Sequence, residues 1–105
     1  MQSREYTSEE VKQQFIEHVR GLVNYWDRES IVQTQSERLQ GLAFSILVAI
    51  DGCSTSLPAF VLAPSPHEDD KQYAIDNGDN YYPQNNELDI KCDISGDLHD
   101  SFYKL

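Results

Sequence analysis

The chain of 105 residues is long enough for one domain with a modest core, and its hydrophobic fraction of 39% excludes an intrinsically disordered protein. Eighteen acids against eight bases give a net charge of −10, which is unevenly distributed. Residues 1–50 carry seven acids and five bases, whereas residues 51–105 carry eleven acids and three bases. Because such a surface repels phosphates, we expect direct binding neither to nucleic acid nor to a membrane.

The longest apolar run, 42–50, is too short to cross a bilayer, and residues 1–10 show no signal-peptide pattern. Without a secretion signal, the two cysteines Cys53 and Cys92 predict reduced thiols. We therefore expect a cytoplasmic protein.

The first predicted element is a helix over 8–28. Thr7 and Glu10 have the spacing of a capping box, in which each side chain bonds the other residue's backbone N–H. Apolar residues then recur every three or four positions, which predicts one buried face: Val11, Phe15, Val19, Leu22 and Trp26.

A second capping box, Thr34 with Glu37, precedes an apolar stretch over 39–50. Its spacing favours a helix, although the β-branched content of 44–50 also allows a strand. Since the stretch is apolar almost all round, we expect it to be the central, most buried element. Gly41 within it would permit a close crossing.

Two strands and two short helices are predicted in the second half. Residues 59–63 are apolar on both faces, as in a covered strand, and 88–94 alternate with Cys92 on the apolar side. Between the two strands, Ser65 would cap a helix that ends at Gly78. After the second strand, Ser95 would cap a C-terminal helix. Leu98, Phe102 and Leu105 would form the buried stripe of that last helix.

These elements predict an α+β fold in a single domain, 1–105. Two long N-terminal helices would pack on a small sheet of two to three strands, with short connecting and C-terminal helices. The pairing sense and order of the strands stay open.

No catalytic or cofactor-binding motif occurs in the sequence, so we assign no catalytic residue and no cofactor, and we favour a binding protein over an enzyme. The alternative is a metal-dependent, hydrolase-like enzyme. It requires two acidic segments, 67–70 and 97–100, to converge on a hard cation. Its candidate ligands are His67, Glu68, Asp69, Asp70, Asp97 and His99. We favour no metal, because acids near helix starts are explained by the helix dipole.

An interaction surface is the other candidate site. Tyrosines among acids suit a basic protein partner, although Tyr81 and Tyr82 could equally pack inside the fold. The candidate surface comprises Tyr81, Tyr82, Asp69, Asp70, Asp97 and Asp100.

The segments "SERLQGLAFSILVAIDG", "LPAFVLAPSPHEDDKQY" and "DISGDLHDSFY" are similar to those of small uncharacterised bacterial and phage-associated proteins. The resemblance covers most of 36–103. It implies a cytoplasmic origin and a mobile-element context, and it carries no activity or site residue with it.

Three functional hypotheses follow. The first is a small acidic cytoplasmic module that binds a basic protein surface; a nucleic-acid-mimicking inhibitor or regulator is one form of it. The second is the metal-dependent enzyme described above. The third is a structural homodimer in which Trp26, Tyr81 and Tyr82 cover the interface.

Overall fold

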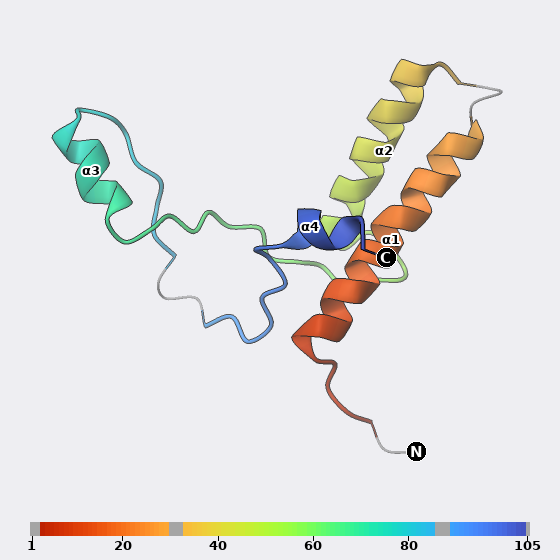
Figure 1. The fold of residues 1–105 in the computed structure, drawn as a ribbon, viewed down its shortest axis with the longest axis horizontal. Helices are drawn as coiled ribbons and strands as arrows, with labels where there is room; N and C mark the ends of the chain where they lie inside the picture. Colours follow the sequence, from red (N-terminus) through yellow and green to blue (C-terminus); the bar gives the residue numbers. More distant parts are fainter. Residues whose placement is uncertain (1–2, 30–32, 86–88, 105) are drawn as a thin grey trace. The chain divides into compact units, whose positions relative to one another are not determined.

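The computed structural model describes residues 3–29, 33–85 and 89–104, and within these ranges it contains helices and connecting segments but no strand. The helices are α1 (Ser8–Arg28), α2 (Gln35–Ile50), α3 (Asp70–Asp76) and α4 (Leu98–Phe102) (Figure 1). The predicted α+β class is therefore wrong, because the described chain is helical. The chain divides into two compact units: a first unit of Met1–Phe60 with Cys92–Leu105, and a second unit of Val61–Lys91.

The boundaries predicted for the first helix are confirmed by α1. Its capping box is complete, since the Thr7 hydroxyl accepts the Glu10 N–H at 3.2 Å and the Glu10 carboxylate accepts the Thr7 N–H at 2.9 Å. Arg4 also donates two hydrogen bonds of 2.7 Å to the Glu10 carboxylate. These contacts satisfy orphan N–H groups of the first turn and place a negative charge at the positive end of the helix dipole.

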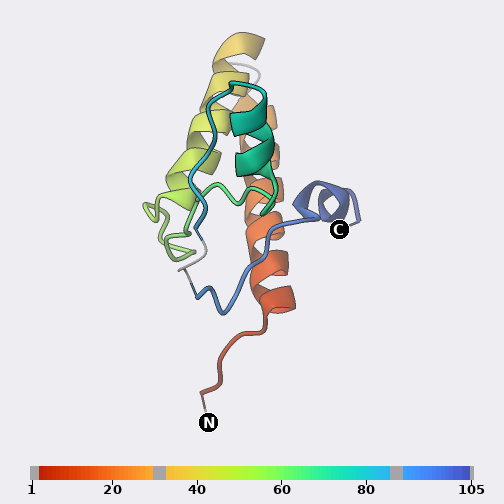
Figure 2. The same cartoon turned by 90° about the vertical axis from the view of Figure 1, so that its left-hand side faces the viewer.

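The helical alternative for 39–50 is confirmed by α2, which begins at the predicted Thr34–Glu37 capping box. The two long helices lie side by side in both ribbon views (Figures 1 and 2). The indole ring of Trp26 lies against Gly41, where a Cβ atom would come within 2.5 Å of the ring. The Trp26 Nε1–H also donates to the Ser45 hydroxyl at 3.1 Å. The absence of a side chain at Gly41 thus makes room for the ring.

The expectation that 39–50 is the most buried element is wrong. Within α2 only Ala49 is buried, while Leu39, Phe44 and Leu47 on another face are largely exposed. Among the helices, α2 packs against α1 alone, which can cover one face of a helix that is apolar on all sides.

Helix α2 ends in a Schellman motif, in which the Cys53 N–H donates to Val48 O and the Gly52 N–H to Ala49 O. Gly52 has the required positive φ of 84°, and a Cβ there would come within 2.5 Å of Ala59. The following segment returns to the helices. Leu57 is buried, and the Phe60 ring meets that of Phe15 edge-on at 5.2 Å between centroids.

The predicted strands at 59–63 and 88–94 are both wrong for the described residues; Leu88 lies outside them. The Phe60 N–H donates to Ile50 O at 2.9 Å. The carbonyl group at the end of α2 therefore accepts a hydrogen bond from the N–H that a strand would donate to its neighbour in a sheet. In the second segment Ile90 and Cys92 are exposed, so the alternating pattern does not bury its apolar side as predicted. Alternation favours a strand only where a neighbouring strand supplies the ladder.

The two short helices begin later than predicted. Asp70 accepts the His67 N–H at 2.8 Å, which forms a separate turn before α3 starts, so Ser65 is not its cap. Ser95 donates both its hydroxyl and its N–H to Asp93, and Gly96 follows with a φ of 116°, so α4 starts only at Leu98. Phe102 is half-buried beneath the Arg20 guanidinium, 4.8 Å from the ring centroid. Leu105 lies outside the described residues.

Candidate functional site

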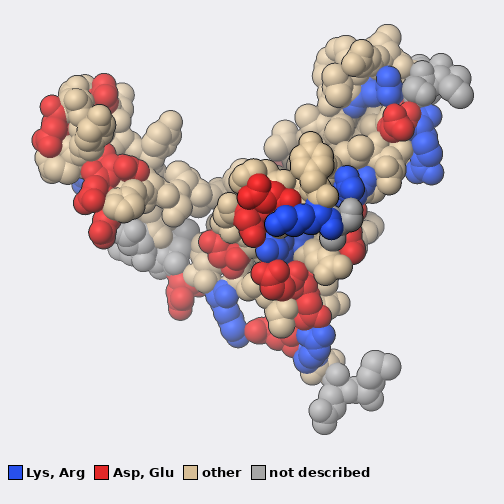
Figure 3. All heavy atoms as spheres, viewed as in Figure 1, with Lys and Arg blue, Asp and Glu red and all other residues tan. Residues whose placement is uncertain are grey.

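The second unit carries the strongest local excess of negative charge. Its sequence contains seven acids and two lysines, whereas bases and acids are interspersed along α1. Figure 3 shows carboxylates gathered over α3 and its neighbouring segments, with blue and red side chains interleaved over the first unit. None of the described residues of the second unit is buried. The described residues of this unit therefore form an exposed surface and no buried core.

A hollow in the second unit is formed by α3 and the segment that follows it. Three exposed tyrosines line it, Tyr73 at 71%, Tyr81 at 50% and Tyr82 at 73% relative exposure. Asp70 and Lys71 from the first turn of α3 line the same hollow, and the Lys71 Nζ lies 5.2 Å from the centroid of the Tyr81 ring. The hollow thus combines aromatic faces, a carboxylate and a cation already in contact with one ring.

The segment 80–85 is held next to the start of α3 by two side-chain amides. Gln84 donates to Glu68 O at 3.3 Å, and Asn85 donates to Pro64 O at 2.8 Å. The Asn77 amide donates to Tyr73 O at 2.7 Å and fixes the end of the helix. The bonds of Gln84 and Asn85 connect the segment after α3 to the segment before it, and these two segments flank the hollow.

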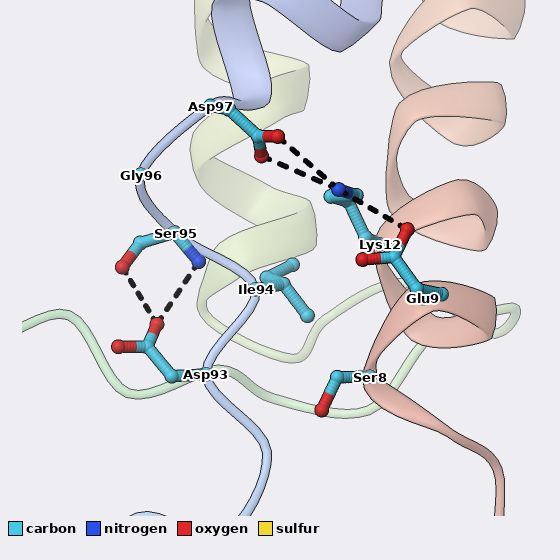
Figure 4. A pocket seen from close by; sticks show the side chains of 8 residues that line it. All are labelled: Ser8, Glu9, Lys12, Asp93, Ile94, Ser95, Gly96 and Asp97. Carbon is cyan, nitrogen blue, oxygen red and sulfur yellow. Dashed lines mark hydrogen bonds and ion pairs between the residues drawn. The ribbon is translucent and has the colours of Figure 1, made fainter.

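A second hollow lies in the first unit and is drawn in Figure 4. Lys12 of α1 reaches Asp97 at 3.3 Å and Glu9 at 3.2 Å, and its side chain is only 16% exposed. Hydrogen bonding to Glu9, and then to Asp97, raises the pKa of Lys12. Because its ammonium lies between two carboxylates, Lys12 is better explained as a structural ion pair than as a catalytic base. We call the Lys12–Asp97 ion pair the clasp, since it joins the C-terminal segment to α1.

The candidate metal ligands divide between the units. His67, Glu68 and Asp69 can each place one ligand atom within 4.8 Å of the others, and all three are exposed. The His67 Nδ1 accepts the Asp69 N–H at 3.2 Å, which occupies a lone pair that a cation would need. Asp97 is engaged by Lys12, and the exposed His99 lies 3.6 Å from Asp100. Convergence of the two segments stays a requirement of the enzyme hypothesis.

The candidate interaction residues divide in the same way. Asp69, Asp70, Tyr81 and Tyr82 belong to the second unit, while Asp97 and Asp100 belong to the first. Among the first four, Asp70, Tyr81 and Tyr82 line one hollow. The surface predicted from the sequence omits Lys71 and Tyr73, which also line this hollow. For Tyr73 a signal was present, because Asp70 and Tyr73 are three residues apart and so lie on one helix face.

In the homodimer hypothesis, Trp26 covers the interface together with Tyr81 and Tyr82. The Trp26 ring instead packs against Gly41 and donates a hydrogen bond to Ser45 of its own chain. The largest exposed apolar side chains of the helical pair lie on α2, at Leu39, Phe44 and Leu47. They are spaced by three to five residues and share one face of the helix.

Comparisons of the chain with protein-family models, with curated proteins and with solved structures give no match. The resemblance noted from the sequence therefore stays an expectation. No helix within the described ranges combines the length and hydropathy that crossing a membrane requires.

Proposed function

We propose that this protein is a small acidic interaction module that binds a basic protein surface through its second unit. The observation that carries the proposal is the coincidence of acids with exposed tyrosines in a unit whose described residues include none that is buried. Tyrosine anchors supply contact area at an interface, and the surrounding charge steers a cationic partner and makes association sensitive to salt.

A nucleic-acid-mimicking inhibitor is the narrower form of this proposal. The carboxylates would then occupy the place of phosphates on a nucleic-acid-binding protein. Such an inhibitor competes with duplex DNA for its partner, and raising the salt concentration weakens both interactions. Failure to displace duplex DNA from a partner that the module binds would reject this form alone.

The experiment that tests the module is a titration of the full chain with fluorescent basic and neutral nonapeptides at low and high salt. Two variants remove the same amount of charge from different units. Asp69→Asn with Asp79→Asn changes the second unit, and Glu17→Gln with Asp27→Asn changes the first. We expect the second-unit variant to bind the basic peptides at least about threefold more weakly than the first-unit variant. Equal affinities, or binding indifferent to salt, would reject the proposal.

The exposed face of α2 favours a second candidate, a structural homodimer formed through Leu39, Phe44 and Leu47. Residues 39–50 contain no charged side chain, so two copies of a chain with a charge of −10 meet least repulsion there. Solution mass measured over about a hundredfold range of concentration tests it, since a dimer dissociates on dilution. Phe44→Ser should then shift the mass toward the monomer, and a concentration-independent monomer mass rejects the candidate.

A further inference from the structure

The hollow between α3 and the segment 80–82 already contains a cation in contact with an aromatic ring. The Lys71 Nζ lies 5.2 Å from the Tyr81 centroid, within the distance at which the negative face of a ring attracts a positive charge. Lys71 is nevertheless exposed, so its ammonium is not enclosed there. The contact shows that the hollow is chemically suited to a cation and that its present occupant is a flexible side chain of the same protein.

Two further tyrosines and a carboxylate surround this contact. Tyr73 and Tyr82 line the hollow and expose more than two thirds of their surface, so their ring faces are accessible. Asp70 uses one carboxylate oxygen, Oδ2, to accept the His67 N–H at 2.8 Å, which fixes the carboxyl group at the edge of the hollow. A carboxylate beside aromatic faces matches a planar guanidinium, which stacks on rings and hydrogen-bonds to carboxylates.

We propose that this hollow binds an arginine side chain of the basic partner, which displaces Lys71 from the Tyr81 ring. The inference rests on the proposed function and identifies the site and the side chain that it recognises. Arginine is favoured over lysine because the guanidinium is more weakly hydrated and presents a flat face to Tyr81 and Tyr82. Asp70 supplies the opposite charge, and Lys71 competes with the ligand for the same ring.

The test is a titration of the full chain with labelled nona-arginine and nona-lysine. We expect nona-arginine to bind more tightly, and Tyr81→Ala with Tyr82→Ala to weaken its binding about three- to tenfold. Tyr81→Phe with Tyr82→Phe keeps the ring faces and should restore most of the affinity. Tyr6→Ala, at an exposed tyrosine of the first unit, is the matched control and should have no effect.

Charge variants test the site independently of total charge. Asp70→Asn should weaken nona-arginine binding more than Asp79→Asn does, although both remove one negative charge from the same unit. Lys71→Gln should strengthen binding more than Lys91→Gln does, because only the former removes the competing cation from the ring. In aromatic NMR spectra, nona-arginine should shift the ring resonances of Tyr81 and Tyr82 and leave those of Tyr6 unchanged.

The outcomes separate this inference from the proposed function. If the wild type binds nona-arginine but each hollow variant behaves as its matched control does, the arginine site is rejected and the acidic module stands. If the wild type binds neither peptide at low salt, both are rejected. Equal affinity for nona-lysine and nona-arginine also overturns the choice of arginine.

Discussion

Lys12 and Asp97 are 85 residues apart in the sequence, and their side chains form an ion pair of 3.3 Å that joins the C-terminal segment to α1. Glu9 approaches the same ammonium at 3.2 Å (Figure 4). Since Arg20 also lies over the Phe102 ring, two cations of α1 contact the final segment. The position of α4 therefore depends on charged contacts as well as on its own short apolar face.

Removing this clasp should loosen the C-terminal segment without unfolding the helical pair. We expect Asp97→Asn to speed hydrogen exchange in 98–104 roughly two- to fivefold, the range for a partly exposed ion pair. Asp100→Asn removes the same charge from α4 without touching Lys12 and is the control. Equal exchange in the two variants would show that the clasp does not hold the segment.

The contact between Trp26 and Gly41 predicts opposite effects for two glycine substitutions. Gly21→Ala adds a methyl group with no atom within 4 Å, so improved helix propensity should raise the free energy of unfolding by about 0.5–1 kcal/mol. Gly41→Ala should lower it by about 1 kcal/mol, because overpacking against the Trp26 ring outweighs the same gain. Urea unfolding measures both. A stabilising Gly41→Ala would contradict the packing of the indole on α2.

The two capping boxes predict how stability responds to acid. Arg4, and then the Thr7 N–H, lower the pKa of Glu10 from its usual 4.5 to about 2 by hydrogen bonding. A lowered pKa in the folded state stabilises the fold above pH 4.5, and this contribution is lost as the pH falls toward 2. The stability difference between wild type and Glu10→Gln should therefore be constant near neutrality and shrink through that window.

Glu37 provides the comparison for this acid effect. The Thr34 N–H and hydroxyl lower its pKa, with no arginine among the causes. The stability difference between wild type and Glu37→Gln should also shrink as the pH falls below the usual pKa of a glutamate. Added salt should reduce the Glu10 effect more than the Glu37 effect, because salt screens the contribution of Arg4. A Glu10 effect that does not change with pH would contradict the bonding of its capping box.

Divalent ions should not stabilise the fold if the acids of 67–70 serve as surface charge. We expect Mg²⁺, Ca²⁺ and Zn²⁺ to leave the Tm at the value found in NaCl of equal ionic strength. A specifically bound ion at about 100 times its Kd would add about 2.7 kcal/mol and raise the Tm by several degrees. Such a rise, abolished by His67→Gln or Asp69→Asn, would instead establish a metal site.

The candidate site was predictable only in part. Tyr81, Tyr82 and Asp70 could be selected from the sequence because tyrosines among acids form an unusual surface. Their convergence on one hollow depends on Gln84 and Asn85, which bond to carbonyl groups 16 and 21 residues earlier. Nothing in the local pattern of polar residues indicates which distant carbonyl group an amide will reach. The contact of Lys71 with Tyr81 depends on the same closure and was not predicted.

The sequence by itself determined α1, because a capping box and a helical stripe are satisfied by residues three or four positions apart. For α2 the same signals favoured a helix but still allowed a strand. The sequence also determined the excess of acids in the second half. Only the tertiary structure decided that 59–63 and 89–94 form no strands and that α1 covers just one apolar face of α2. The physical reason is common to both: a strand and a buried face each need a neighbour, and the identity of that neighbour depends on contacts between distant parts of the chain.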